Sequence, residues 1–495
     1  MTEPLPWQED EIPHYMDKDR ALLFEPGLGK SFVIVRTMAH WFRTEQLAAA
    51  IVFAPNGVHR NWVDQITEHM PPDIPVDVIV WDSSSMKIKG AVQRWIAGHA
   101  PEKLHILLVN IEAMSHAGPR AIIEQWMRFE GQRRGPVLLT LDEFHQVRNP
   151  ASKRSRALWA MAKFATVRRI LSGTPIPRGW ENIYSPFRVL GWQYLGAPTF
   201  MAFKTEFCIL KPMAVGGRSF TIIDGYKNIP ELQRRIDTVS SRKTLDLAGL
   251  PPALGGITGT VPLVISLPMN EQQEAHYKAL EQSALTLLAD GLPILGDQAI
   301  ALVARLQQIT GGGLIRTGTD TIEWFGSPKV EATVQLAATS ETPILVWSRY
   351  RHEVDQLAAA LKAELPERSV FRHHGGISNL DRLMARNEWS KSSAGILVAT
   401  AATLGTGFTL NEARLSIFYS NSFRYEERYQ AERRNLRIGQ GKSVSYWDIS
   451  CKNTVDEHVL KVLRGRQDLQ TLLMGSPSAT LGSLLRNTDS MMVSP

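Results

Sequence analysis

Cysteine and long apolar runs are both scarce in this chain of 495 residues. Its only cysteines, Cys208 and Cys451, stand too far apart in sequence to indicate a disulfide framework or a zinc site. No apolar run approaches the ~20 residues that a membrane helix needs. The N-terminus is acidic and interrupted by proline, unlike a signal peptide. We therefore expect a cytoplasmic protein that does not associate with membranes.

Positively charged residues slightly outnumber negatively charged ones. The chain has 55 lysines and arginines against 49 aspartates and glutamates, a net charge of +6, and its pI is about 9.2. This balance permits a polyanionic partner without requiring one. Among the 13 histidines, His373 and His374 are sequence neighbours, a spacing that does not suit two ligands on one helix face. We expect no histidine-based metal centre.

The length exceeds what one hydrophobic core supports, so we expect two domains. Short apolar runs alternate with helix-length segments in two regions, which is typical of parallel sheets covered on both faces. The runs lie at 50–54, 76–81, 105–109, 137–141 and 169–171, and again at 343–347, 395–400, 415–419 and 444–449. We predict an α/β lobe over 1–195, a helical insert and linker over 196–328, a second α/β lobe over 329–475 and a tail over 476–495.

Residues 24–31 read Phe-Glu-Pro-Gly-Leu-Gly-Lys-Ser, between a short apolar run and a β-branched one. Gly27 and Gly29 allow a tight turn whose N–H groups point inward, and the start of the following helix favours phosphate. Lys30 would reach the β- and γ-phosphates of a nucleotide, and the Ser31 hydroxyl would bind Mg²⁺. The stretch predicts a nucleotide site, although Phe24 replaces the first glycine of the strict pattern.

Two adjacent carboxylates, Asp142 and Glu143, follow the apolar run 137–141. In open α/β sheets the carboxyl end of a strand is where ligands gather. A solvated turn is the common meaning of such a pair, but a P-loop upstream favours a catalytic one. Asp142 would then hold Mg²⁺ and Glu143 would polarise the attacking water.

The stretch from Asp142 to Asn149 resembles the Asp-Glu-Ala-His box of superfamily II helicase-like ATPases of the Swi/Snf, or chromatin-remodeller-like, type. Other segments are similar to motifs of this family in the same order. They are a glutamine motif at 5–8, the P-loop at 25–31, motif Ia at 54–62, motif III at 171–175, motifs IV and V at 375–382 and 399–410, and motif VI at 430–440. The resemblance implies two RecA-like P-loop lobes with a helical insert between them and ATP bound between the lobes.

Motif VI contains Arg434 and Arg437, which one helical turn would place on the same face. Arginine suits phosphate oxygens, and such arginines stabilise charge in the transition state of phosphoryl transfer. Phe144 departs from the family pattern, where alanine or cysteine is usual, and we expect its ring to pack into the interior.

The resemblance implies a role for further residues. Nucleotide binding is expected of Gln8, Gly27, Leu28, Gly29, Lys30, Ser31, Gly405, Gln430, Arg434 and Arg437. Catalysis is expected of Lys30, Asp142, Glu143, Arg434 and Arg437, with Mg²⁺ held by Ser31 and Asp142. Coupling of hydrolysis to movement is expected of His145, Ser172, Gly173 and Thr174. DNA contacts are expected of Asn56, His59, Ser348, Arg349, Thr400 and Thr403.

The implied function is that of a monomeric, DNA-dependent ATPase that uses ATP and Mg²⁺ to move along double-stranded DNA and displace or remodel bound material. One alternative is a strand-separating or branch-migrating helicase. Another is a nucleic-acid-binding scaffold without turnover, which conflicts with the presence of all the catalytic residues. No accessory module is recognisable, which points to a bacterial or viral source and the cytoplasm of such a host.

Overall fold

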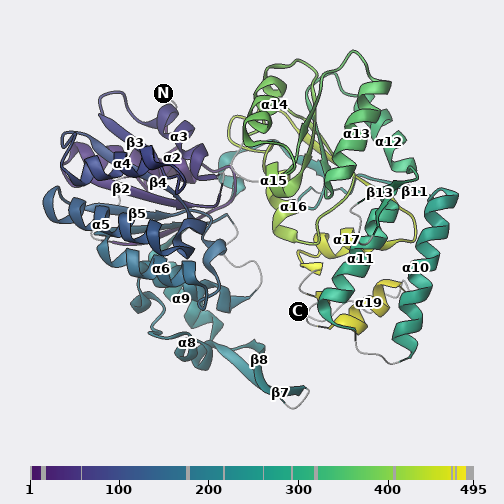
Figure 1. Ribbon diagram of the computed structural model, residues 1–495, viewed down its shortest axis with the longest axis horizontal. Helices are drawn as coiled ribbons and strands as arrows, with labels where there is room; N and C mark the ends of the chain where they lie inside the picture. The colour runs from purple at the N-terminus through teal and green to yellow at the C-terminus, as the bar shows by residue number, and fades with distance from the viewer. Residues whose placement is uncertain are drawn as a thin grey trace. The chain divides into compact units, whose positions relative to one another are not determined.

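The computed structural model describes residues 3–12, 18–56, 58–173, 179–215, 218–259, 261–290, 294–316, 321–404, 409–469, 472–473 and 476–485. The chain forms two compact units, residues 1–248 and 249–495 (Figure 1). Each unit is built on one sheet of seven parallel strands covered by helices. The prediction of two α/β lobes is confirmed.

The first sheet has the strand order β3-β4-β2-β5-β6-β1-β9. Its strands are β1 (Arg20–Phe24), β2 (Ala49–Ala54), β3 (Val76–Val80), β4 (Leu104–Asn110), β5 (Val137–Leu141), β6 (Val167–Leu171) and β9 (Ser240–Lys243). Strands β2 and β5 are buried along their whole length, because runs of apolar residues suit a parallel sheet covered on both faces. The carboxyl ends of these strands meet at one edge of the sheet.

Helices α2 to α6 each connect one strand of this sheet to the next in sequence. The helices of the first unit are α1 (Pro6–Glu9), α2 (Lys30–Arg43), α3 (Val58–His69), α4 (Met86–Ile96), α5 (Ala117–Arg133), α6 (Lys153–Met161), α7 (Tyr184–Leu190), α8 (Phe200–Phe207) and α9 (Ile229–Val239). A two-stranded hairpin, β7 (Cys208–Val215) and β8 (Arg218–Tyr226), extends from the end of α8 (Figure 1).

The second sheet has the order β10-β18-β17-β14-β16-β15, and β11 also pairs with β18. Its strands are β10 (Ala253–Gly255), β11 (Val264–Leu267), β14 (Ile344–Ser348), β15 (Val370–His373), β16 (Ile396–Thr400), β17 (Leu415–Phe418) and β18 (Val444–Cys451). The other elements are α10 (Glu271–Ala289), α11 (Gly296–Thr310), β12 (Gly313–Ile315), β13 (Ile322–Trp324), α12 (Pro328–Ala338), α13 (Arg351–Glu364), α14 (Asn379–Lys391), α15 (Ala401–Leu404), α16 (Tyr425–Glu432), α17 (Val455–Arg464) and α19 (Pro477–Leu485).

The stretch 196–328, predicted as a helical insert, contributes strands to both sheets. It contains the helices α10 and α11, but β9 pairs with β1 in the first sheet, and β10 and β11 pair with β18 in the second. The sequence Ser-Ser-Arg-Lys of β9 has no apolar run, so its strand conformation depends on pairing with β1. The boundary between the compact units, at 248/249, falls inside this stretch.

The C-terminal helix α19 belongs to the hydrophobic core of the helical part of the second unit. Leu481 and Leu484 on α19 join the same buried cluster as Val303 on α11 and Val459 on α17. Among the described residues, no helix has the length and apolar character that crossing a membrane requires.

A buried arginine joins α16 to the second sheet. Arg428 is 1% exposed, and its Nη2 donates to Asp448 Oδ2 at 3.0 Å while its Nε donates to Glu432 Oε1 at 2.8 Å. Its guanidinium carbon lies 3.3 Å from the centroid of the Phe418 ring. Burial by itself lowers the pKa of Arg428, but the carboxylates of Asp448 and Glu432 outweigh burial and hold that pKa above its usual value. The arginine is therefore charged and fully compensated.

We expect Arg428→Met to lower the free energy of unfolding by about 3–5 kcal/mol, because it removes the cation that two buried carboxylates share. Among the described residues, Asp448 would keep only the more distant Arg464 as a cation, at 3.8 Å. Urea denaturation followed by tryptophan fluorescence measures the loss. Arg424→Met is the control, since the ion pair of Arg424 with Glu427 is partly exposed and should contribute about 0–1 kcal/mol. A loss below about 1 kcal/mol for Arg428→Met would contradict the role of this network.

Candidate nucleotide site

The P-loop connects the end of β1 to the start of α2, at the carboxyl edge of the first sheet. Gly27 and Gly29 have φ angles of 94° and 77°, in the left-handed region that glycine adopts without strain. Gly29 directly precedes α2, whose first N–H groups make a site for an anion. The Lys30 Nζ donates to the Phe24 carbonyl oxygen at 2.9 Å, which holds its ammonium group over the loop.

The glutamine motif packs onto the P-loop. The Gln8 Nε2 donates to the Leu28 carbonyl oxygen at 3.1 Å, and the Gln8 Oε1 accepts from the Leu5 N–H at 2.9 Å. A Cβ atom on Gly29 would lie 2.7 Å from Gln8 Nε2, so only glycine fits beneath this side chain. Trp7 and Phe24 meet edge to face with ring centroids 5.6 Å apart. These contacts place Gln8 against the P-loop, and nucleotide binding by Gln8 stays a prediction.

The Asp142 and Glu143 pair follows β5 at the same edge. Asp142 is 6% exposed, with Oδ1 accepting from the Glu143 N–H at 2.9 Å and Oδ2 accepting from the Trp62 Nε1–H at 3.1 Å. Burial, followed by the charge of Glu143, raises the pKa of Asp142 to about 6, while the charge of Lys30 acts in the opposite direction. A buried carboxylate with a second acid beside it favours a bound cation, and its oxygens are ligands that Mg²⁺ prefers.

Glu143 adopts a left-handed backbone conformation with a φ of 47°. Its carboxylate oxygen Oε2 lies 3.4 Å from the Nδ1 of His145, whose Nε2 in turn contacts the Gln146 amide at 2.9 Å. Phe144, next to Glu143, is buried and meets Phe187 edge to face, as expected for a ring that packs into the interior. The buried Phe144 ring thus lies between two residues, Glu143 and His145, whose polar side chains are near each other.

Strand β6 lies between β1 and β5, so the residues after it lie between the P-loop and the acidic pair. The Ser172 N–H donates to the Leu22 carbonyl oxygen at 3.1 Å. A Cβ on Gly173 would lie 2.7 Å from Pro26 Cγ in the P-loop, so this glycine permits a close backbone contact. Thr174, the third coupling residue of this motif, lies outside the described residues.

In the second unit, the expected helical geometry of motif VI is wrong. Helix α16 ends at Glu432, and Arg434 and Arg437 lie in the turns that follow, not on one helix face. The buried Asn435 explains the break, since its Nδ2 donates to the Ala413 carbonyl oxygen at 3.2 Å and draws the chain against the sheet. Arg434 is 2% exposed.

The remaining motif VI positions differ in exposure. Arg437 is partly exposed, its Nε donating to the Arg433 carbonyl oxygen at 2.8 Å and its Nη1 to Thr409 Oγ1 at 3.1 Å. Gln430 is 7% exposed on α16. Gly405, predicted to bind nucleotide, lies outside the described residues.

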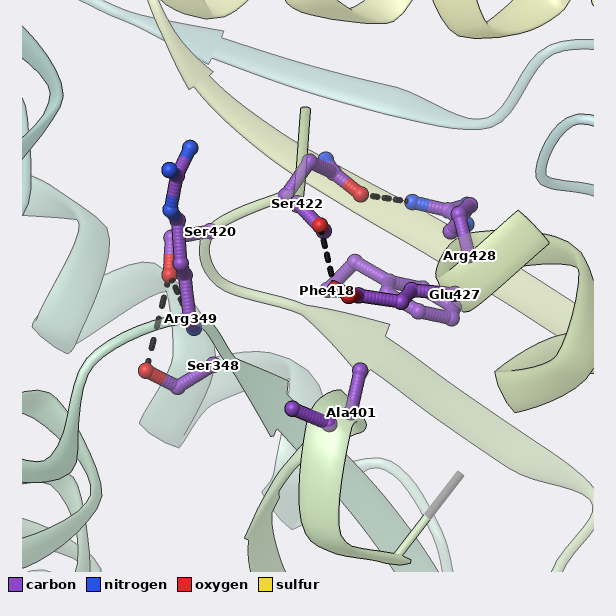
Figure 2. Close-up of a pocket in the computed structure, with 10 residues that line it drawn as sticks. Ser348, Arg349, Ala401, Phe418, Ser420, Ser422, Glu427 and Arg428 are labelled. Atoms are coloured by element: carbon purple, nitrogen blue, oxygen red, sulfur yellow. Dashed lines mark hydrogen bonds between the residues drawn. The ribbon is translucent and has the colours of Figure 1, made fainter. Parts of the chain in front are cut away.

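A small pocket opens at the carboxyl ends of β14, β16 and β17, beside the start of motif V (Figure 2). From β14 the chain continues toward the β15 edge of the sheet, whereas from the adjacent β17 it continues toward β18 in the opposite direction. Ligands bind at such switch points in α/β folds. The pocket holds about 30 Å³, room for one or two water molecules. Ser348, Ser420 and Ser422 surround it (Figure 2).

Several side chains expected to contact DNA are turned into the protein. Ser348 is 1% exposed and donates to Glu353 Oε2 at 2.5 Å, and Thr400 is 4% exposed and shares a 2.7 Å hydrogen bond with Thr403. Arg349 is half-buried, with its guanidinium carbon 3.4 Å from the centroid of the Phe423 ring. Ser348 and Arg349 line the pocket, and the buried Ser348 and Thr400 do not present their hydroxyls to the solvent.

In the first unit, Asn56 is exposed but His59 is 2% exposed. Burial, and then the charge of Arg60, lower the pKa of His59 to about 4, so its ring is neutral at physiological pH. The enclosed ring does not suit the phosphate contact expected of it. Arg60, one position later on α3, is an exposed cation that sequence reasoning did not consider, and its exposure depends on the helix register. Trp62 was also missed, since its sequence gives no sign of its bond to Asp142.

Comparisons with known proteins identify the family to which the sequence motifs are similar. The SNF2-related domain family matches residues 16–310 and the helicase conserved C-terminal domain family matches residues 328–439. The SWI/SNF-related matrix-associated actin-dependent regulator of chromatin subfamily A-like protein 1 of Xenopus tropicalis is 22% identical over 476 residues, covering 93% of this chain and 44% of that protein. The DNA annealing helicase and endonuclease ZRANB3 of Bos taurus is 21% identical over 459 residues, covering 91% and 39%.

The chain thus spans less than half the length of these relatives. Among solved structures, the Sulfolobus solfataricus SWI2/SNF2 ATPase core in complex with dsDNA aligns with a TM-score of 0.39 and 18% identity, covering 97% of this chain and 95% of that one. Because the first family match covers more than half of the sequence, the chain belongs to the SNF2-related family of helicase-like ATPases.

Proposed function

We propose that this protein is an ATP-hydrolysing translocase that moves on double-stranded DNA and displaces or remodels material bound there. The observation that supports it best is the convergence of Gln8, the P-loop, the acidic pair and Ser172 with Gly173 on one edge of the first sheet. The double-stranded substrate is inferred from family membership, and a relative crystallised with dsDNA is consistent with it.

In the proposed reaction, the P-loop N–H groups and Lys30 bind the phosphates of ATP. Ser31 and Asp142 would hold Mg²⁺, which supplies charge neutralisation at the transferred phosphoryl group. Glu143 orients and polarises the attacking water, and His145 holds the Glu143 carboxylate from 3.4 Å away. Arg434 and Arg437 stabilise the charge of the transition state. In the first unit, we propose that Asn56 and Arg60 contact the DNA backbone.

A phosphate-release assay with no nucleic acid, single-stranded DNA, duplex DNA, forked DNA and RNA tests the proposal. Duplex DNA should stimulate turnover most, and a rate indifferent to every nucleic acid would contradict a motor. Triplex displacement measured beside strand displacement separates a translocase from a strand-separating helicase. DNA binding should weaken steeply as salt is raised, because phosphate contacts release counterions.

We expect Lys30→Ala to abolish ATP binding or turnover, because it removes the ammonium group over the phosphate site. Glu143→Gln should bind ATP but hydrolyse it on the order of 10²–10⁴ more slowly, since the amide cannot act as a base. Phosphate release and binding of a fluorescent ATP analogue separate the two effects. Turnover at the wild-type rate in either variant would show that the site is misassigned.

We expect Arg437→Ala to reduce turnover by about 10³ while leaving duplex DNA affinity unchanged, as for arginines that act on the transition state. Lys442→Ala, at an exposed position in the same segment, is the matched control and should keep wild-type turnover. Single-turnover hydrolysis and a DNA-binding titration measure the two quantities. Equal losses in both variants would rule out a specific role for Arg437.

The pKa of about 6 for Asp142 predicts a pH dependence. The carboxylate gains a proton as pH falls through this value, and a protonated acid is a poor Mg²⁺ ligand. The kcat/KM for ATP with Mg²⁺, which reports the free enzyme, should be level above pH ~7 and fall about tenfold per unit below pH ~6. A profile that stays level down to pH ~4, the ordinary aspartate range, would contradict this assignment.

A further inference from the structure

The magnesium-side carboxylate is fixed by a tryptophan from a different element. Trp62 on α3 is 1% exposed and donates its indole Nε1–H to Asp142 Oδ2 at 3.1 Å, across 80 positions of sequence. The other oxygen, Oδ1, accepts from the Glu143 N–H. The Asp142 N–H donates to the Phe53 carbonyl oxygen at 2.7 Å, on the strand that leads into α3. Backbone and side chain of Asp142 are therefore both tied to the β2–α3 segment.

The same helix presents polar groups to solvent close to Trp62. Arg60, in the first turn of α3, is exposed, as is Asn56, two residues before the helix begins, whereas Val58, His59 and Trp62 are buried. Arg60 and Trp62 lie in the same turn of α3, so a contact that shifted this turn would also shift the indole. At its other end, α3 contacts α2, where the ring centroid of His69 lies 5.0 Å from that of Phe32, the residue after Ser31.

We propose that Trp62 is a positioning residue that orients Asp142 toward Mg²⁺ and transmits DNA contact at the first turn of α3 to the metal end of the site. The second half of this inference rests on the proposed function. An indole N–H is a donor only, so it neither ligates a cation nor takes a proton. Trp62 acts by fixing the rotamer of Asp142 and leaving the remaining lone pairs of its oxygens available.

Partners that orient a metal ligand typically contribute 10–100-fold to metal affinity. In a Glu143→Gln background, where ATP is not consumed, Trp62→Phe should raise the Mg²⁺ concentration that half-saturates fluorescent ATP binding by about tenfold. Affinity for the nucleotide measured in EDTA should be unchanged, because Lys30 and the P-loop are untouched. Thermal unfolding in the absence of nucleotide checks that the variant is folded.

Trp126→Phe is the matched control. Trp126 on α5 is fully buried, and its Nε1 has no hydrogen-bond partner among the described residues, so the change removes the same volume without removing a bond. This control should keep the wild-type Mg²⁺ dependence. An unchanged Mg²⁺ dependence in Trp62→Phe, or an equal shift in both variants, would overturn the positioning role.

Coupling to DNA is measured as the factor by which duplex DNA changes the affinity for ATP with Mg²⁺, a factor that is reciprocal between the two ligands. Trp62→Phe should reduce this factor toward one, and Trp126→Phe should retain it. Retention of the full factor by Trp62→Phe would overturn the link through α3. A wild-type protein without any DNA effect would overturn that link and the proposed function together, whereas the Mg²⁺ titration decides the positioning role separately.

Discussion

A carboxylate withdrawn from water at the edge of a parallel sheet is the constraint on which the first unit depends. Asp142 is fixed through both of its oxygens, and burial raises its pKa to about 6. Such a group is costly unless a cation is near it. The Lys30 ammonium group supplies one positive charge near Asp142, and the proposed Mg²⁺ would supply another. Both depend on the P-loop and the acidic pair lying at the same edge of the sheet. The order of strands adds the third component, since β6 brings Ser172 and Gly173 between them.

The second unit depends on buried ion pairs. Arg428 is enclosed by Asp448 and Glu432, and Lys329 donates to Asp456 at 3.1 Å with the lysine fully buried. Pairs of this kind add little net stability compared with apolar packing, but breaking one leaves an uncompensated charge. The Arg428–Asp448 pair joins α16 to β18, and the Lys329–Asp456 pair joins α12 to α17. Glu432 marks the point where α16 ends and the arginine-bearing turns begin.

Some features of the candidate site could be predicted from local sequence patterns, whereas others depend on contacts between residues far apart in sequence. The placement of Gly27, Gly29, Lys30, Asp142 and Glu143 at the carboxyl ends of strands was predictable, because it depends on neighbours in sequence, a strand followed by a turn or helix. The exposure of Arg60 and the burial of His59 could not be predicted from the sequence, because both depend on which face of α3 packs against the sheet. The helical face assumed for Arg434 and Arg437 failed for a similar reason, since the Asn435 amide bonds to a carbonyl 22 positions away in sequence.

The sequence by itself determined the two α/β lobes and the family, and it predicted the residues of a nucleotide site, because apolar runs and glycine turns act through neighbouring residues. Tertiary structure alone decided that β9, β10 and β11 complete the sheets. The sequence of β9 is polar, and β10 and β11 are only three and four residues long, so none of them indicates a strand. Pairing with a neighbouring strand satisfies their backbone groups. It also decided that an indole from α3 holds Asp142, because a single hydrogen bond between residues far apart in sequence has no pattern in the chain.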